Sequence, residues 1–298
     1  MNATSPVRGL PVWYEILTPD AAACRRFYTA LFDWKEVPWA SGAGEYLMFA
    51  VGERPICGLD DRSVKPGEPA RWVTYFSVDD VDATLAANEA AGGATLAGPD
   101  DVPEVGRMAA CTDPQGAVWC PFRPSNAPAV QDTASRAPGD FIWVELLSKQ
   151  PEDAALHYAD LLGYTVETMD MGAMGLYRVL KVGEVGIGGV MPMPPDAAAP
   201  PQWLPYVRAV DVDATAARAQ SLGARVELPP TDIGDVGRVA VLTDPRAPAS
   251  RFTDRARPSL TQGGTRWPRH CRLSAPRTSG DCPAWARLAR RRTGARCW

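Results

Sequence analysis

Two glutamates are the residues of this sequence best placed to do chemistry. Each stands two positions after a tryptophan, in the segments Trp13-Tyr-Glu15 and Trp143-Val-Glu145. Side chains two positions apart in a β-strand point to the same face, so each glutamate would share a surface with an aromatic ring. A carboxylate that loses water in such surroundings has a raised pKa, which suits a general base. We therefore predict Glu15 and Glu145 as catalytic residues. The alternatives are an ion pair that only supports the fold, or a glutamate that turns away to the rim of the cup.

Neighbouring strand residues indicate what surrounds these glutamates. Val12, Tyr14 and Ile16 alternate with the glutamate face and are expected to face helices. By the same alternation, tyrosines of a later strand are expected to point toward the glutamates. Two arginines could form ion pairs with the glutamates. A mostly apolar wall with a few polar groups is typical of a small-molecule pocket, although such tryptophans could equally fill a core. The predicted substrate-binding residues are Trp13, Tyr75, Arg107, Trp143, Tyr206 and Arg238.

An internal repeat explains why these residues come in pairs. Val105-Gly-Arg107 ahead of Thr112-Asp-Pro114 returns as Val236-Gly-Arg238 ahead of Thr243-Asp-Pro245. One duplicated unit of about 125 residues therefore accounts for most of the chain.

The pattern halves again inside each copy. The first half of a copy has an extended run, then Asp20 as a helix cap, then a helical stretch over 21–32. The second half repeats this order with an extended run, Asp80 and a helical stretch over 81–91. Shorter alternating runs follow each helix and predict strands. We expect an α+β fold of two tandem domains. Each would consist of paired βαβββ modules that form a cupped mixed sheet with helices on its outer face.

These residues resemble the vicinal oxygen chelate superfamily, which holds the glyoxalases, bleomycin-resistance proteins and extradiol dioxygenases. The resemblance rests on the Pro-Asp helix start at 19–20, on Phe27-Tyr28 in the first helix and on Thr112-Asp-Pro-Gln-Gly-Ala117 before the last strand. It covers roughly residues 8–246. The expected domains are 8–123 and 141–254, each glyoxalase-like, joined by a linker at 124–140 that is rich in proline, serine and alanine.

In metal-dependent members of this superfamily, four side chains of four strands converge on a divalent ion. The matching positions hold Trp13, Cys57 or a neighbour, Val73 and Cys120 in the first copy, and Trp143, Gly188, Leu204 and Arg251 in the second. Divalent ions that prefer oxygen and imidazole need Asp, Glu or His, and none stands there. No cofactor is therefore expected, with a divalent metal kept as the alternative although its usual ligands are absent. Cys57 and Cys120 could hold a soft metal, with small buried core residues as the alternative.

Charge is distributed unevenly along the chain. Residues 255–298 contain eleven arginines and one acidic residue, a balance of +10. The overall charge of −4 therefore leaves −14 for residues 1–254, which disfavours nucleic acid as a partner of the folded body. The composition breaks inside the strand expected to end the second copy, so we predict that this strand is disrupted. Such a break is similar to translation in a shifted reading frame, and a basic arm for nucleic acid or an anionic membrane is the alternative.

The remaining expectations concern partners and activity. Seven cysteines without paired spacing predict reduced thiols and a cytoplasmic protein. The tandem repeat supplies both domains, so we expect a monomer with a small-molecule ligand and no membrane contact. Metal-free cups would bind a small organic molecule, with a lyase, isomerase or hydroxylase reaction left open. A metal-dependent lyase or dioxygenase of the same superfamily is one alternative. A drug-sequestering or interaction protein without catalysis is the other.

Overall fold

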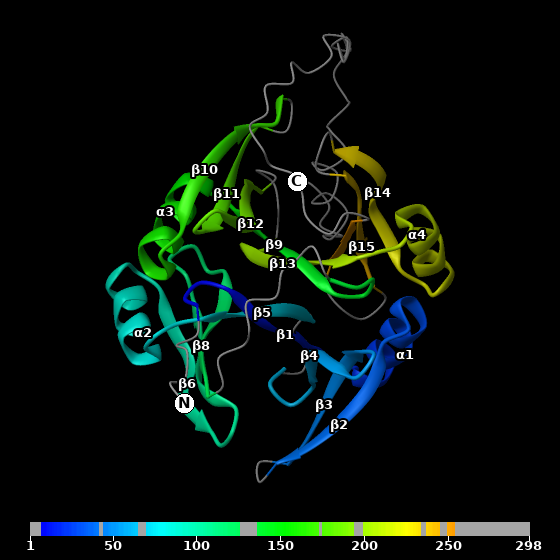
Figure 1. Cartoon of the computed structure of the whole chain (residues 1–298), viewed down its shortest axis with the longest axis horizontal. Helices are drawn as coiled ribbons and strands as arrows, with labels where there is room; N and C mark the ends of the chain where they lie inside the picture. Colours follow the sequence, from blue (N-terminus) through cyan, green and yellow to red (C-terminus); the bar gives the residue numbers. More distant parts are fainter. Residues whose placement is uncertain are drawn as a thin grey trace, which may run out of the picture.

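The structure is a computed structural model (Figure 1). It describes residues 7–41, 44–64, 70–125, 136–172, 175–193, 199–233, 237–244 and 249–253. These residues form two eight-stranded mixed sheets, each with two helices on one face. The expected α+β fold of two tandem halves is confirmed.

The first sheet combines two βαβββ modules. Its elements are β1 (Pro11–Leu17), α1 (Ala21–Phe32), β2 (Lys35–Ser41), β3 (Gly44–Val51), β4 (Arg54–Asp60), β5 (Arg71–Ser77), α2 (Val81–Ala90), β6 (Ala94–Val102), β7 (Gly106–Thr112) and β8 (Val118–Pro124). The strand order is β2-β3-β4-β1-β5-β8-β7-β6. β1 runs parallel to β4 and antiparallel to β5, so the two modules join through the central pair β1 and β5.

The second sheet repeats this arrangement. Its elements are β9 (Phe141–Ser148), α3 (Pro151–Leu162), β10 (Thr165–Asp170), β11 (Leu176–Val182), β12 (Val185–Pro192), β13 (Gln202–Arg208), α4 (Val212–Ser221), β14 (Arg225–Ile233), β15 (Gly237–Thr243) and β16 (Ala249–Thr253). The strand order is β10-β11-β12-β9-β13-β16-β15-β14. Each strand of the second sheet therefore has its counterpart in the first.

The helix-bearing faces of the two sheets share one hydrophobic core. Tyr14 on β1 stacks on Phe141 on β9, with ring centroids 4.0 Å apart, and Phe76 on β5 lies 4.9 Å from Trp203 on β13. α1 lies beside α4 and α2 beside α3, one pair on each side of this core (Figure 1). The opposite face of each sheet forms the cup, so the two cups open away from one another.

Two matched hydrogen bonds connect the halves across this core. The Trp34 indole donates to the carbonyl of Gly139 at 3.0 Å, and the Tyr164 hydroxyl donates to the carbonyl of Gly9 at 2.6 Å. Both donors and both acceptors occupy equivalent places in the repeat. The halves therefore pack as two copies related by an approximate two-fold axis.

The prediction that the last strand of the second copy is disrupted is wrong. Ala249–Thr253 forms β16, which pairs in parallel with β13 and antiparallel with β15. This strand has five residues where β8 has seven. Phe252 is fully buried, and its ring packs edge-to-face on Phe32 with the ring centroids 5.2 Å apart. This large apolar side chain therefore anchors β16 in the core.

Two predicted segments fall largely outside the described residues. They are the basic tail 255–298 and most of the linker 124–140. Across the part of the chain that the structure describes, no helix has both the length and the apolar composition needed to cross a membrane.

Candidate functional site

Glu15 lies on the central strand β1 and points into the first cup. Trp13 shares its face, while Tyr14 and Ile16 point into the core. Val12 was expected to face the helices, and this expectation is wrong. The pairing of β1 with β5 shifts register between Pro11 and Trp13, and Val12 lines the cup instead.

Two tyrosines hold the carboxylate of Glu15. Tyr46 on β3 donates its hydroxyl to Oε1 at 2.6 Å, and Tyr75 on β5 donates to Oε2 at 2.7 Å. The Trp13 indole donates to the Tyr46 hydroxyl at 3.3 Å and so orients it. Burial raises the pKa of Glu15 above its ordinary value, and the hydrogen bonds from Tyr46 and Tyr75 oppose that rise. The arrangement gives a partly buried carboxylate whose position is fixed on both oxygens.

Tyr46 reaches Glu15 because the neighbouring strand has a glycine there. Gly58 on β4 lies directly opposite Glu15 in the parallel ladder, and a Cβ at Gly58 would collide with the Tyr46 hydroxyl. A side chain at this position would therefore exclude the tyrosine from the carboxylate.

A cavity of about 990 Å³ opens over this network. Its wall is mostly apolar and aromatic, and its few charged groups lie on three different segments. The lining residues are Val12, Trp13, Glu15, Trp39, Tyr46, Met48, Arg62, Tyr75, Val102, Glu104, Val105, Met108, Phe122 and Ser125. Such a cavity has the size and composition of a small-molecule site.

The second cup contains the same network. The Trp143 indole donates to the Tyr177 hydroxyl at 2.9 Å. Tyr177 and Tyr206 donate to Oε2 of Glu145 at 3.3 and 3.0 Å. Gly189 lies opposite Glu145, and a Cβ there would collide with Tyr177, as at Gly58 in the first cup. The same set of side chains therefore occurs in both cups. Each set consists of a Trp, a Glu and two Tyr residues, with a glycine beside the Tyr that accepts from the Trp.

The two cups differ in how open they are. Glu145 is 4% exposed and Trp143 3% exposed, whereas Glu15 and Trp13 are only partly buried. Trp143 packs in a cluster of side chains on the cup face of the second sheet, which comprises Ile142, Trp143, Val179, Tyr206 and Val239. The polar pair of the first cup, Asp60 and Arg62, corresponds to Met191 and Met193. The first cup is thus the more accessible and the more polar.

Sequence reasoning missed Tyr46 and Tyr177. Both lie on strands next to the edge of their sheets, β3 and β11, where the sequence indicates only short alternating runs. They are 131 residues apart, the spacing that also separates Tyr75 from Tyr206. This shared spacing was the signal that could have identified them.

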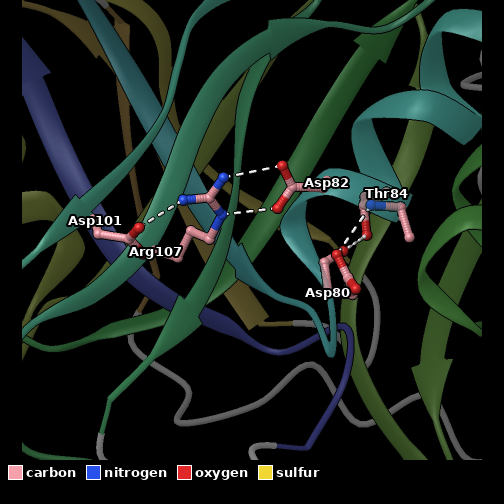
Figure 2. A network of polar contacts seen from close by, with 6 residues as sticks. Asp80, Asp82, Thr84, Asp101 and Arg107 are labelled. Atoms are coloured by element: carbon pink, nitrogen blue, oxygen red, sulfur yellow. Dashed lines mark hydrogen bonds and ion pairs between the residues drawn. The ribbon is translucent and has the colours of Figure 1, made fainter.

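Arg107 and Arg238, predicted to bind substrate, lie outside this network. Arg107 donates to both oxygens of Asp82 at 2.7 and 2.9 Å and to Asp101 at 2.7 Å (Figure 2). Arg238 makes the matching ion pair with Asp213. Met108, next along β7, lines the cavity, so Arg107 points to the other face of its strand. The ion pair with Glu15 that was considered as the alternative is thus replaced, at Arg107, by pairs with Asp82 and Asp101.

The two cysteines considered for a soft metal lie in different clusters. Cys57 packs in the shared core with Tyr14, and Cys120 packs with Leu17 and Val73 on the cup face. Burial raises the pKa of both thiols well above its ordinary value, which disfavours the thiolate that a metal needs. They therefore do not form a ligand pair.

The donors in the cup do not fit a divalent ion. The carboxylate of Glu15 accepts a phenol on each oxygen, and Trp13, Val73 and Gly58 supply no ligand. His157, on α3, bonds Asn88 at 3.1 Å between the halves. No group of three or more His, Cys, Asp or Glu side chains within the described ranges could hold a metal ion.

The fold and the site define a tandem protein of paired βαβββ modules with a carboxylate in each cup. The chain belongs to the glyoxalase/bleomycin resistance protein/dioxygenase superfamily, whose family model matches residues 11–120. A protein of Mycobacterium tuberculosis named as a candidate glyoxylase, CFP32, is 37% identical over 246 residues, covering 80% of this chain and 92% of that protein. The anthracycline biosynthesis protein DnrV of Streptomyces peucetius is 34% identical over 252 residues, covering 80% and 90%.

Solved structures share the fold at low sequence identity. The Mn(II)-bound glyoxalase of Novosphingobium aromaticivorans has a TM-score of 0.55 and 19% identity, covering 84% of this chain and 83% of that one. A variant of homoprotocatechuate 2,3-dioxygenase from Brevibacterium fuscum has a TM-score of 0.58 and 13% identity, covering 88% and 76%. At these identities the likeness concerns the fold alone.

Proposed function

We propose that the first cup binds a flat, largely apolar organic molecule and that Glu15 takes up a proton from it. One observation carries this proposal: a single carboxylate, fixed by two phenols, lies on the floor of an aromatic cavity of about 990 Å³. Rings on opposite walls can enclose a planar molecule, since Trp39 and Tyr46 come from one side of β1 and Tyr75 and Phe122 from the other.

The raised pKa of Glu15 supports its role as a base. Burial makes the ionised carboxylate a stronger proton acceptor than a carboxylate in water. Proton removal by a positioned carboxylate is a step common to isomerases and lyases, and typically contributes about 10² to 10⁴-fold to a rate. Trp13, Tyr46 and Tyr75 would position Glu15 for this transfer.

One of the two relatives supports an aromatic ligand. DnrV is named for the biosynthesis of anthracyclines, which are flat polycyclic compounds, and CFP32 is named as a candidate glyoxylase. The two names differ in chemistry, and the lining of the cavity supports one of them. Its five aromatic side chains favour a flat ring system over a small aliphatic aldehyde. A metal-dependent lyase or dioxygenase reaction lacks suitable ligands in the cup, and no step is assigned to a metal.

The test uses the full-length chain and the two equivalent glutamates. A panel of flat aromatic compounds is screened by native mass spectrometry, and bound compounds are followed for turnover. Glu15→Gln is expected to lower turnover by about 10² to 10⁴-fold with little loss of thermal stability. Glu145→Gln provides the matched change in the second cup, and equal losses in both variants would mean that both cups act. Binding without turnover would support the sequestering alternative. Full activity of Glu15→Gln would contradict the proposal.

A further inference from the structure

The hydrogen bonds on the floor of the first cup all run in one direction. The Trp13 N–H donates to Tyr46, and the hydroxyls of Tyr46 and Tyr75 donate to Glu15. An indole has one donor, a phenol has one donor, and an ionised carboxylate has none. Every donor of these four side chains is therefore already used.

The groups left for a ligand on the floor are acceptors. Each Glu15 oxygen keeps a lone pair after accepting one phenol, and the Tyr75 oxygen keeps its acceptor sites. The Tyr46 oxygen already accepts from Trp13. A ligand carbonyl, ether or carboxylate that reached this floor would exchange hydrogen bonds with water for repulsive contacts with other acceptors.

The mouth of the cavity does not impose this restriction. Arg62 supplies donors there, and its Nε donates to Asp60 at 3.3 Å. Glu104 supplies acceptors, and both residues are exposed. We therefore expect discrimination between ligand groups at the floor of the cavity, whose residues are more buried than the exposed Arg62 and Glu104 at its mouth.

We propose that the first cup selects molecules that present a hydrogen-bond donor, a hydroxyl or an amine, at the end that enters first, and rejects those that present only an acceptor there. This inference rests on the proposed function of the same cup. The leading O–H or N–H donates to Glu15, and the flat body lies between the aromatic walls.

Three naphthalene probes test the proposal by isothermal titration calorimetry on the full chain. They share a flat ring system and differ in one group: 2-naphthol has a donor, while 2-methoxynaphthalene and 2-naphthoate have only acceptors at pH 8. We expect 2-naphthol to bind at least tenfold more tightly than either of the others. This ratio corresponds to about 1.4 kcal/mol.

Substitutions then locate the discrimination. Glu15→Gln places an amide donor on the floor, so the ratio of the affinities for naphthol and ether is expected to fall below about threefold. Glu53→Gln makes the same change in the exposed turn between β3 and β4 and is expected to leave the ratio unchanged. Tyr75→Phe frees a lone pair of Glu15 and is expected to preserve or widen the ratio, which gives a second variant if Glu15→Gln fails to fold.

The outcomes separate this inference from the proposed function. Equal binding of naphthol and ether, or a ratio that Glu15→Gln leaves unchanged, would overturn the selection for donors while leaving an aromatic-binding cup. Failure of all three probes to bind would overturn the proposed function and this inference with it.

Discussion

Glu15 is set apart from an ordinary surface carboxylate by two opposing effects. Burial raises its pKa, and the phenols of Tyr46 and Tyr75 stabilise its ionised form. The Tyr46 hydroxyl makes two hydrogen bonds, because it accepts one from Trp13 and donates one to Glu15. At the scale of residues, Glu15 is therefore a carboxylate whose pKa is set by the balance between burial and the hydrogen bonds of its neighbours.

Removing one phenol should raise the pKa of Glu15 further. Tyr75→Phe deletes the donor to Oε2, so the pH at which activity or binding changes is expected to move upward. The pH profile of turnover or of ligand binding checks this. Tyr14→Phe alters a phenol on the other face of β1 and serves as control. A profile that Tyr75→Phe shifts downward would contradict the assigned hydrogen bond.

The raised pKa of Glu15 also predicts how stability depends on pH. A carboxyl group with a higher pKa in the folded state than in the unfolded state binds more protons when folded, so its ionisation costs stability as the pH rises from about 4.5 through the folded value. Glu15→Gln cannot ionise. The free energy of unfolding of the variant, measured in urea, should therefore increase relative to wild type across this window. A difference that is constant with pH would contradict the raised pKa.

At the scale of elements, paired strands decide which side chains meet. Tyr46 belongs to β3 and Glu15 to β1, two strands that are separated by β4. The hydroxyl crosses β4 at Gly58, where a Cβ would collide with it. A glycine at one register position thus connects two strands that do not pair.

Gly58→Ala should break this connection. The new Cβ displaces Tyr46, so ligand affinity is expected to fall, with a loss of about 1 to 3 kcal/mol in stability from overpacking. Gly189→Ala repeats the change in the second cup. Calorimetric titration and urea unfolding measure the two effects. Unchanged ligand binding in Gly58→Ala would show that Tyr46 does not position Glu15.

The helices and strands were predictable from the sequence, but the face of the strand on which a given side chain lies was less so. The repeat and the Asp-capped helices were sufficient to predict both sheets, because each copy must bury the same apolar stripe. The face of Arg107 was not predictable, since β7 pairs with β6 through two register shifts that alternation alone cannot place. Val12 was misplaced for the same reason. The expected disruption of β16 failed because burial of Phe252 needs only one suitable residue at one position.

At the scale of the whole molecule, the two halves stabilise one another. The core between the sheets includes Phe76, Trp203 and Tyr158, and the Tyr158 hydroxyl also donates to the buried Asp113 of the other half at 3.2 Å. Each half covers the helix-bearing face that the other would otherwise expose. We therefore propose that the chain is a monomer whose halves unfold together.

Trp203→Ala tests this coupling. The residue is 1% exposed and packs on Phe76 of the first half, so its removal is expected to cost about 3 to 5 kcal/mol. Urea unfolding is followed by far-ultraviolet and near-ultraviolet circular dichroism. Both signals should show a single transition in wild type, and the variant should unfold in one transition at a lower urea concentration. Sedimentation equilibrium should give the mass of one chain. Separate transitions for the two halves would contradict the shared core.

The claim that Glu15 receives the ligand in the first cup is tested most directly by following its carboxyl carbon with ¹³C nuclear magnetic resonance. The signal is assigned by its loss in Glu15→Gln, and it is titrated with pH in the free chain and with saturating 2-naphthol. We expect the pKa of Glu15 to lie above the ordinary 4.5 in the free chain, and the Glu15 signal to change clearly when the probe binds. A Glu15 that titrates at or below 4.5, or a signal that bound probe leaves unmoved, would contradict it.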